Sequence, residues 1–249
     1  METITLTTLI FGSLTILAAG LTSGLTGFGY GLVSVPLLIL ILPPQTVVPI
    51  IVILSTIINI TVAWEARKHI SLRRIWTLLI GGMIGTPVGA YFLKSLDANV
   101  LKVWIGGVIV VFGVLFLKGF KKQVAHEKLA LLPIGLVSGL LNGSTSMSGP
   151  PVILFFSNQS LDKQTFRASL VTYFTALNFF TIPVFLANGL FTLTTVKYSL
   201  IFLVPMFIGV TIGIKLSHRL PENLFRRIAL IIVTLAGAFS IVSGLRLIG

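Results

Sequence analysis

The sequence contains no cysteine, which excludes disulfide bonds, thiol redox chemistry and Cys-ligated metal sites. Charged residues are scarce: they make up 10% of the chain, against about 25% in a typical soluble domain. No carboxylate lies within an apolar run, and the three histidines all lie between such runs. A proton relay through carboxylates, a His-based metal site and a hydrolase with a buried histidine are therefore not indicated. We predict no catalytic residue, no metal and no cofactor, and hence no enzyme.

Hydrophobic residues, in contrast, make up 55% of the chain. They form successive runs of roughly 20 residues, the length that crosses the hydrocarbon core of a bilayer as a helix. The formal net charge of +12 raises the question of a nucleic-acid partner. Because the basic residues lie between the apolar runs rather than on one soluble face, we predict no nucleic acid and a lipid bilayer as the surroundings.

Two stretches interrupt the apolar runs with small and polar residues. Gly20–Pro36 reads GLTSGLTGFGYGLVSVP, and Gly135–Pro151 reads GLVSGLLNGSTSMSGPP. Their first glycines and their last prolines are both 115 positions apart, so the two align without a gap. Each shows G-L-x-S-G-L, then a polar or glycine-rich break, then proline. We interpret both as broken helices whose polar tips face each other inside the membrane.

The duplication extends beyond these stretches. Asn59 recurs 119 positions later as Asn178, and Gly85 and Gly89 recur 124 positions later as Gly209 and Gly213. Small, ordered increases in spacing are what loop insertions produce. The predicted domains are membrane repeat 1 (1–117), a cytoplasmic basic linker (118–128) and membrane repeat 2 (129–249).

Basic residues predict the orientation of the repeats. Of the 18 lysines and arginines, 14 lie in segments assigned to the cytoplasmic side by the positive-inside rule. They are Arg67, Lys68, Arg73, Arg74, Lys118, Lys121, Lys122, Lys128, Lys163, Arg167, Lys215, Arg219, Arg226 and Arg227. This places both termini outside and equivalent turns of the two repeats on opposite sides. The predicted fold is an all-α integral membrane protein of two inverted repeats, each a re-entrant, broken-helix hairpin plus three transmembrane helices.

Chain breaks inside a bilayer leave free N–H groups at the start of the second helical arm, where the helix dipole also favours an anion. Pro36 and Pro151 suit the first turn of such an arm, and Ser34 and Ser148 suit its N-cap. Glycines let a ligand approach the backbone, and hydroxyl and amide groups add donors. The predicted substrate-binding residues are Gly27, Phe28, Gly29, Tyr30, Ser34, Asn59, Asn142, Ser144, Thr145, Ser146, Ser148, Gly149 and Asn178.

Structural interpretations of the same residues remain open. Serine and threonine in membrane helices often donate to their own backbone carbonyls. Glycines at four-residue spacing outside the breaks favour close helix packing, and Asn59 and Asn178 could join helices. Arg167 is expected either to reach the membrane interface or form an ion pair, or else to line a cytoplasmic vestibule.

The two motifs and the basic loops together resemble the TauE/SafE sulfite-exporter family, and the resemblance covers nearly the whole chain. It implies export of sulfite or organosulfonates across a bacterial inner membrane. We therefore expect a secondary transporter for a small sulfur-containing anion that works by alternating access. An anion channel of the same fold and a non-transporting membrane scaffold are the alternatives; the coupling ion and a homo-oligomeric state are left open.

Overall fold

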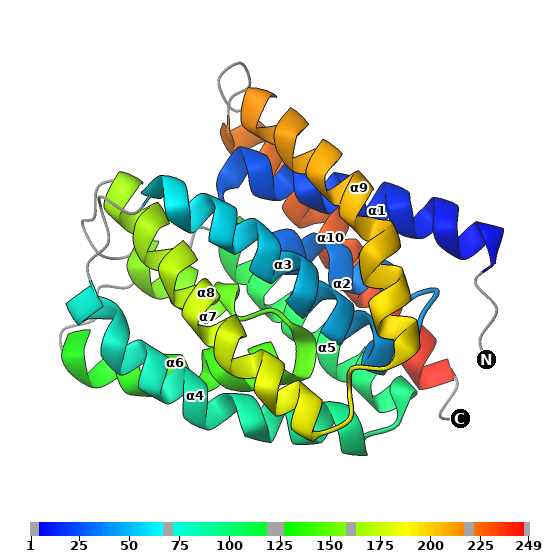
Figure 1. Cartoon of the computed structure of the whole chain (residues 1–249), viewed down its shortest axis with the longest axis horizontal. Coiled ribbons are helices and arrows are strands. Elements are labelled where there is room, and N and C mark those ends of the chain that lie inside the picture. The colour runs from blue at the N-terminus through cyan, green and yellow to red at the C-terminus, as the bar shows by residue number, and fades with distance from the viewer. Residues whose placement is uncertain (1–4, 67–71, 119–126, 158–162, 217–221, 247–249) are drawn as a thin grey trace. The chain divides into compact units, whose positions relative to one another are not determined.

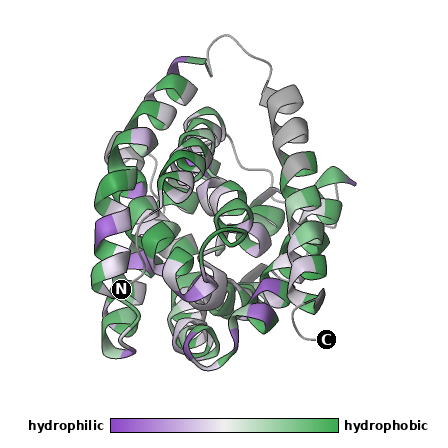
Figure 2. Ribbon diagram, turned by 90° about the vertical axis from the view of Figure 1, so that its right-hand side faces the viewer, coloured by the Kyte–Doolittle hydropathy of each residue, from purple (hydrophilic) through white to green (hydrophobic). Residues whose placement is uncertain are grey.

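Every regular element in the described residues of the computed structural model is a helix; these residues are 5–66, 72–118, 127–157, 163–216 and 222–246. Six helical stretches in these ranges are long and apolar enough to cross a membrane, and Figure 2 shows apolar residues along most of the helices. The predicted basic linker 118–128 lies mostly outside the described residues. The helices are α1 (Leu6–Thr26), α2 (Tyr30–Leu38), α3 (Pro44–Ala66), α4 (Leu72–Ser95), α5 (Ala98–Leu117), α6 (Glu127–Thr145), α7 (Gly149–Ser157), α8 (Lys163–Ala187), α9 (Leu193–Leu216) and α10 (Glu222–Arg246).

The order of helix lengths repeats along the chain. Helices α1 to α5 contain 21, 9, 23, 24 and 20 residues. Helices α6 to α10 contain 19, 9, 25, 24 and 25 residues. A long helix, a nine-residue helix and three long helices thus occur twice, as the duplication predicts. The inversion of the repeats and the re-entry of their hairpins stay predictions.

The register of the duplication at the breaks differs from the one that the motifs suggested. The chain turns into the left-handed region at Gly27 (φ 80°) and again at Ser146 (φ 56°), and these positions differ by 119 rather than 115. The short helices begin at Tyr30 and Gly149, again 119 positions apart. The motif alignment was therefore wrong by four residues, about one helical turn.

The described helices form two compact units, each of which combines elements from both halves of the sequence. Unit 1 comprises Met1–Leu54, Leu96–Lys118 and Phe191–Gly249. In it α1 packs along α9, α5 packs along α10, and the short α2 lies against α1 and α10. Figure 1 shows α1 and α9 side by side.

Unit 2 comprises Ser55–Ser95 and Gly119–Leu190, so that α3 passes from one unit to the other between Leu54 and Ser55. Helix α4 packs along α6 in the most extensive contact of the unit, and α8 lies against α4. The short α7 contacts α6 and α8. Each short helix is thus held within one unit, next to the long helix that precedes it.

Glycines allow the long helices of each unit to approach backbone to backbone. In unit 2, a Cβ on Gly143 would meet the carbonyl oxygen of Thr86 and lie 2.7 Å from the nitrogen of Ala90. In unit 1, a Cβ on Gly24 would meet the carbonyl oxygen of Val210 and lie 2.9 Å from the nitrogen of Ile214. Gly24 and Gly143 are 119 positions apart and their partners 124, so the same contact occurs in both units. The packing interpretation of these glycines is confirmed.

Candidate functional site: two helix breaks

The break in unit 1 spans Gly27, Phe28 and Gly29 and is closed by its own backbone. Gly27 ends α1 in the left-handed conformation and donates its N–H to the carbonyl of Ser23 at 2.7 Å. Gly29 also has positive φ (90°), which a residue without Cβ adopts at no steric cost. The Thr26 hydroxyl lies 2.9 Å from the Thr22 carbonyl and 2.7 Å from the Phe28 carbonyl. These contacts leave the threonine side chain engaged within the break.

Helix α2 begins directly after Gly29, which corrects two predictions. Ser34 is no N-cap: it lies inside the helix, fully buried, and its hydroxyl donates to the Tyr30 carbonyl at 2.7 Å. Pro36 is the seventh residue of α2 rather than part of its first turn. The two glycines complete the change of direction early, so the helix starts about one turn sooner than the serine and proline suggested. Tyr30 is buried, and its hydroxyl has no partner among the described residues.

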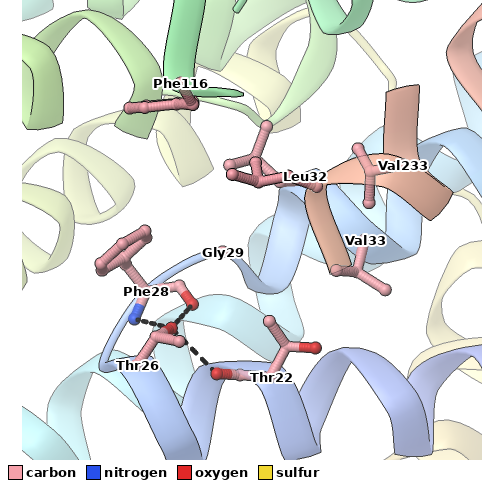
Figure 3. A pocket seen from close by; sticks show the side chains of 9 residues that line it. Thr22, Thr26, Phe28, Gly29, Leu32, Val33, Phe116 and Val233 are labelled. Atoms are coloured by element: carbon pink, nitrogen blue, oxygen red, sulfur yellow. Dashed lines mark hydrogen bonds between the residues drawn. The ribbon is translucent and has the colours of Figure 1, made fainter. Parts of the chain in front are cut away.

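A small pocket of about 30 Å³ adjoins this break (Figure 3). Its lining is almost entirely hydrocarbon and comes from α1, α2, α5 and α10. Thr22 contributes to it, but its hydroxyl donates to the Ala18 carbonyl at 2.8 Å. A single water needs about 10–15 Å³, so the pocket is too small for a sulfonate and lacks donors for one. The lining residues are Thr22, Thr26, Phe28, Gly29, Leu32, Val33, Phe116, Leu230 and Val233.

The break in unit 2 turns at a serine instead of a glycine. Ser146 ends α6 with φ 56° and donates its N–H to the Asn142 carbonyl at 2.9 Å. It is the one residue other than glycine with positive φ in the described ranges. Its side chain is 9% exposed, and its buried hydroxyl has no hydrogen-bond partner there. A strained backbone position and an unsatisfied buried hydroxyl thus coincide at one residue.

Helix α7 begins at Gly149, with Ser148 immediately before it and Pro150 and Pro151 at its second and third positions. Pro151 therefore lies in the first turn, as predicted. Because proline has no N–H, the two prolines remove donors that a helix start normally offers to an anion. Hydroxyl groups must consequently supply a larger share of any anion binding at this break.

A chain of two hydrogen bonds fixes this break, and no pattern in the sequence indicated it. The Tyr173 hydroxyl of α8 donates to Ser138 Oγ at 2.9 Å, and the Ser138 hydroxyl donates to the Ser148 carbonyl at 2.7 Å. All three residues are buried. Ser138 belongs to the G-L-x-S-G-L motif but was not among the predicted substrate-binding residues, and Tyr173 lies 35 positions away. The pair positions the residue that precedes α7.

The structure brings together two of the three predicted asparagines. Asn142 Nδ2 of α6 donates to Asn178 Oδ1 at 3.2 Å and to Thr181 Oγ1 at 2.8 Å, both on α8. Asn178 Nδ2 in turn donates to Ser55 Oγ at 3.0 Å. Asn142 and Asn178 are 1% and 3% exposed, so this network is buried. Asn59 is half-buried on α3, and no contact places it in the network.

The other predicted residues of unit 2 differ in what their polar groups do. Ser144 and Thr145 donate to the carbonyls one turn back, Leu140 and Leu141, at 2.8 and 2.7 Å. Gly149 lies beside the ring of Phe174, whose Cζ would be 3.6 Å from an added Cβ. Arg167 lies in the second turn of α8 with its Nε buried and unpartnered in the described part of the chain.

The asparagine network carries a prediction about stability. Changing Asn178 to Ala should remove one hydrogen-bond partner from Ser55 and one from the Asn142 amide in a buried site. We expect this to lower the free energy of unfolding by about 1–3 kcal/mol. The apparent Tm of the detergent-purified protein should then fall by about 5 °C. The matched control is Asn59→Ala at the equivalent repeat position, where we expect a shift below about 1 °C. Equal shifts for both variants would contradict a structural role specific to the network.

A comparison with known protein families gives the identification. The family model described as "Sulfite exporter TauE/SafE" matches residues 13–240, which include both breaks and all the long helices except the ends of the first and last. The chain belongs to the TauE/SafE family. This confirms the resemblance inferred from the motifs, and together with the six apolar stretches it indicates a multi-pass membrane protein.

Among curated proteins, this TauE/SafE member is similar to the "Probable sulfite/organosulfonate exporter TauE" of Cupriavidus necator. The two are 30% identical over 156 residues, which cover 60% of this chain and 61% of that relative. The match thus spans less than two thirds of the length of the relative. No solved structure matches the chain.

Proposed function

We propose that this protein is a secondary transporter that exports a small sulfur-containing anion, sulfite or an organosulfonate, across the bacterial inner membrane. The family and the name of the curated relative support the substrate class. Transport would proceed by alternating access between two inverted repeats with re-entrant hairpins, both termini lying outside. Inverted repeats with broken helices at the substrate site are a recurrent transporter design.

The observation that carries the proposal is Ser146. Its hydroxyl is buried and unpartnered, and it lies three residues before α7 in the hydroxyl-rich break. An anionic oxygen of the substrate accepts the hydrogen bond of this hydroxyl, together with the N–H groups of Ser148 and Gly149. Hydrogen bonds to charged groups contribute about 1.5–3 kcal/mol each, enough for a specific site from a few donors. Gly27, Phe28, Gly29 and Tyr30 of the other break remain predicted substrate contacts.

Transport in proteoliposomes tests the proposal directly. Vesicles loaded with labelled sulfite, sulfoacetate or ethanesulfonate should release the anion faster with the protein than without it, and release should saturate with concentration. Saturable flux that the other anions inhibit supports a transporter. Flux that rises linearly with concentration would show a channel, and no flux of any of these anions would show a scaffold or another substrate.

Ligand binding provides a second expected result that needs no transport assay. Anions that bind the native state stabilise it, by about 2.7 kcal/mol at 100 times the Kd. In a thermal-unfolding panel, sulfite or one of the sulfonates should therefore raise the apparent Tm by about 5 °C or more. Chloride and an uncharged sulfone of similar size serve as controls. Equal stabilisation by chloride would contradict selectivity for sulfur oxyanions.

A further inference from the structure

Buried hydroxyl groups in this protein normally donate to the carbonyl one turn back. The hydroxyls of Thr86, Thr181 and Ser199 each donate a hydrogen bond of 2.8 Å to a backbone carbonyl, that of Gly82, Leu177 and Thr195 respectively. Lipid offers no partner for a free hydroxyl, so this local bond is the default within a bilayer. A membrane helix whose buried hydroxyls do not make it needs another source of partners.

The first half of α8 departs from this rule at two hydroxyl residues, and a third polar group close to them is also unpartnered. Ser169 is fully buried and Thr172 partly so, and the buried hydroxyl oxygens of both have no hydrogen-bond partner in the described ranges. The same is true of Nε of Arg167. An unsatisfied buried group costs about 1–3 kcal/mol, and more when it is charged. Three of them within two helical turns indicate partners other than the described residues, and we take these partners to be water and an anion.

Helical geometry relates Arg167 to the break of unit 2. Phe174 and Asn178 follow Arg167 by 7 and 11 positions, which at about 100° per residue places all three within about 20° of one face of α8. Phe174 lies beside Gly149 at the start of α7, and Asn178 bonds Asn142 on α6. This face of α8 therefore faces the break. Arg167 lies on it, about 10 Å along the axis from the level of Phe174.

Ser169 and Thr172 lie on a different side of α8, one that includes Tyr173. Tyr173 packs near Gly82 of α4 and bonds Ser138 of α6. Ser169 precedes Tyr173 by one turn. Its free hydroxyl therefore lies nearer the N-terminus of α8 than the hydrogen bond that joins α8 to α6. The beginning of α8 thus carries unpartnered polar groups on two sides, whereas the part from Tyr173 onward is bonded to its neighbours.

We infer that water surrounds the first half of α8. On the side of Arg167 it forms an access route to the unit 2 break, in which Arg167 is the cation that captures the oxyanion, and it continues round the helix to Ser169 and Thr172. The guanidinium is permanently charged and presents paired N–H donors that fit sulfonate and sulfite oxygens. Ser169 and Thr172 take water as their partners. This inference rests on the proposed function, because it names the entry step for the same transported anion.

Cysteine accessibility tests the route, and the natural absence of cysteine makes each introduced thiol unique. The variants Ser169→Cys and Thr172→Cys should react in membranes with both anionic methanethiosulfonate ethylsulfonate and the cationic trimethylammonium reagent. The matched control is Thr181→Cys on the same helix, since Thr181 is as buried as Ser169 but is hydrogen-bonded to both Asn142 and Leu177. We expect it to react at least tenfold more slowly. Equal, slow reaction at all three positions would overturn the route.

The same reagents test the role of Arg167. Introducing Arg167→Gln should lower the rate ratio of anionic to cationic reagent by about tenfold, and Arg167→Lys should preserve much of the ratio. Raising the salt to 0.5 M should lower the ratio without any mutation, because the Debye length shortens. An unchanged ratio in Arg167→Gln and at high salt would overturn the capture role. These rates require no transport: reactive cysteines without sulfonate flux would contradict the proposed function, whereas flux without reactive cysteines would contradict only the inference.

Discussion

Replacing Gly139 by alanine should lower the stability of the protein by about 3 kcal/mol and thereby abolish the proposed transport activity. A Cβ at this position would overlap the carbonyl oxygen of Gly82 on α4 and lie 2.7 Å from its Cα. Both atoms belong to the backbone, so no side-chain rotation relieves the overlap and the two helices must move apart. Overpacking of this kind typically costs about 1–3 kcal/mol, and the rigid partner places this site at the upper end.

The measurement is thermal unfolding of purified protein, where a loss of about 3 kcal/mol should lower the apparent Tm by roughly 10 °C. Gly107→Ala on α5 is the matched control, because nothing lies within 4 Å of its Cβ position. Alanine has the higher helix propensity, by about 1 kcal/mol, so the control should be neutral or stabilising. A Gly139→Ala protein as stable as this control would show that α4 and α6 tolerate a wider spacing than their glycines indicate.

The same loss should follow in unit 1 from Gly24→Ala, whose Cβ would overlap the carbonyl oxygen of Val210 on α9. Both contacts belong to the duplicated pattern, and both join a first-half helix to a second-half helix within one unit. The packing of each unit therefore depends on its own close glycine contact, at Gly139 in unit 2 and at Gly24 in unit 1. Because these glycines directly precede the breaks in the chain, their contacts also fix where the breaks lie.

Glycine spacing explains why the sequence located the duplication but not its register. Gly20 and Gly24 in the first half correspond to a run of three glycines in the second, Gly135, Gly139 and Gly143. Because the spacing is four residues, the first-half pair aligns equally well with Gly135 and Gly139 or, one helical turn later, with Gly139 and Gly143. The positive φ at Gly27 and at Ser146 decides between the two alignments. A positive φ is expected at glycine but not at serine, so the sequence alone could not show that Ser146 corresponds to Gly27.

The helix breaks that form the candidate site were predictable from the sequence, but the hydrogen bonds around them were not. The run of hydroxyl residues before Pro150 identified the second break, since apolar membrane helices rarely tolerate such a run. Which hydroxyl stays free depends on local geometry: Ser144 and Thr145 find carbonyls one turn back, and Ser146, in the left-handed region, finds none. The Tyr173–Ser138 pair joins residues 35 positions apart, and no periodicity links them.

Ser146 provides the second large expected effect, on substrate affinity rather than stability. In Ser146→Ala and Ser146→Gly the affinity for the transported anion should fall about tenfold or more, because a hydrogen bond to a charged group contributes about 1.5–3 kcal/mol. Stability should stay within about 1 kcal/mol of the wild type, since the hydroxyl has no partner in the described protein. Glycine also removes the strain of a side chain at positive φ, which offsets its greater freedom in the unfolded chain.

At Gly27, the equivalent residue of unit 1, we expect the opposite result, a loss of stability rather than of affinity. In Gly27→Ala a Cβ is forced into the left-handed conformation at φ 80°, at a cost of about 1–2 kcal/mol, with no hydroxyl gained or lost. The apparent Tm should fall, while the anion affinity of the folded fraction should fall much less than in the Ser146 variants, because Gly27 can contact the anion only through its backbone, which alanine retains. Anion binding is measured by ligand-induced thermal shift and by the concentration that gives half-maximal flux. If both Ser146 variants kept wild-type affinity, the backbone strain at this serine would have no ligand to account for it, and the anion site would have to lie elsewhere.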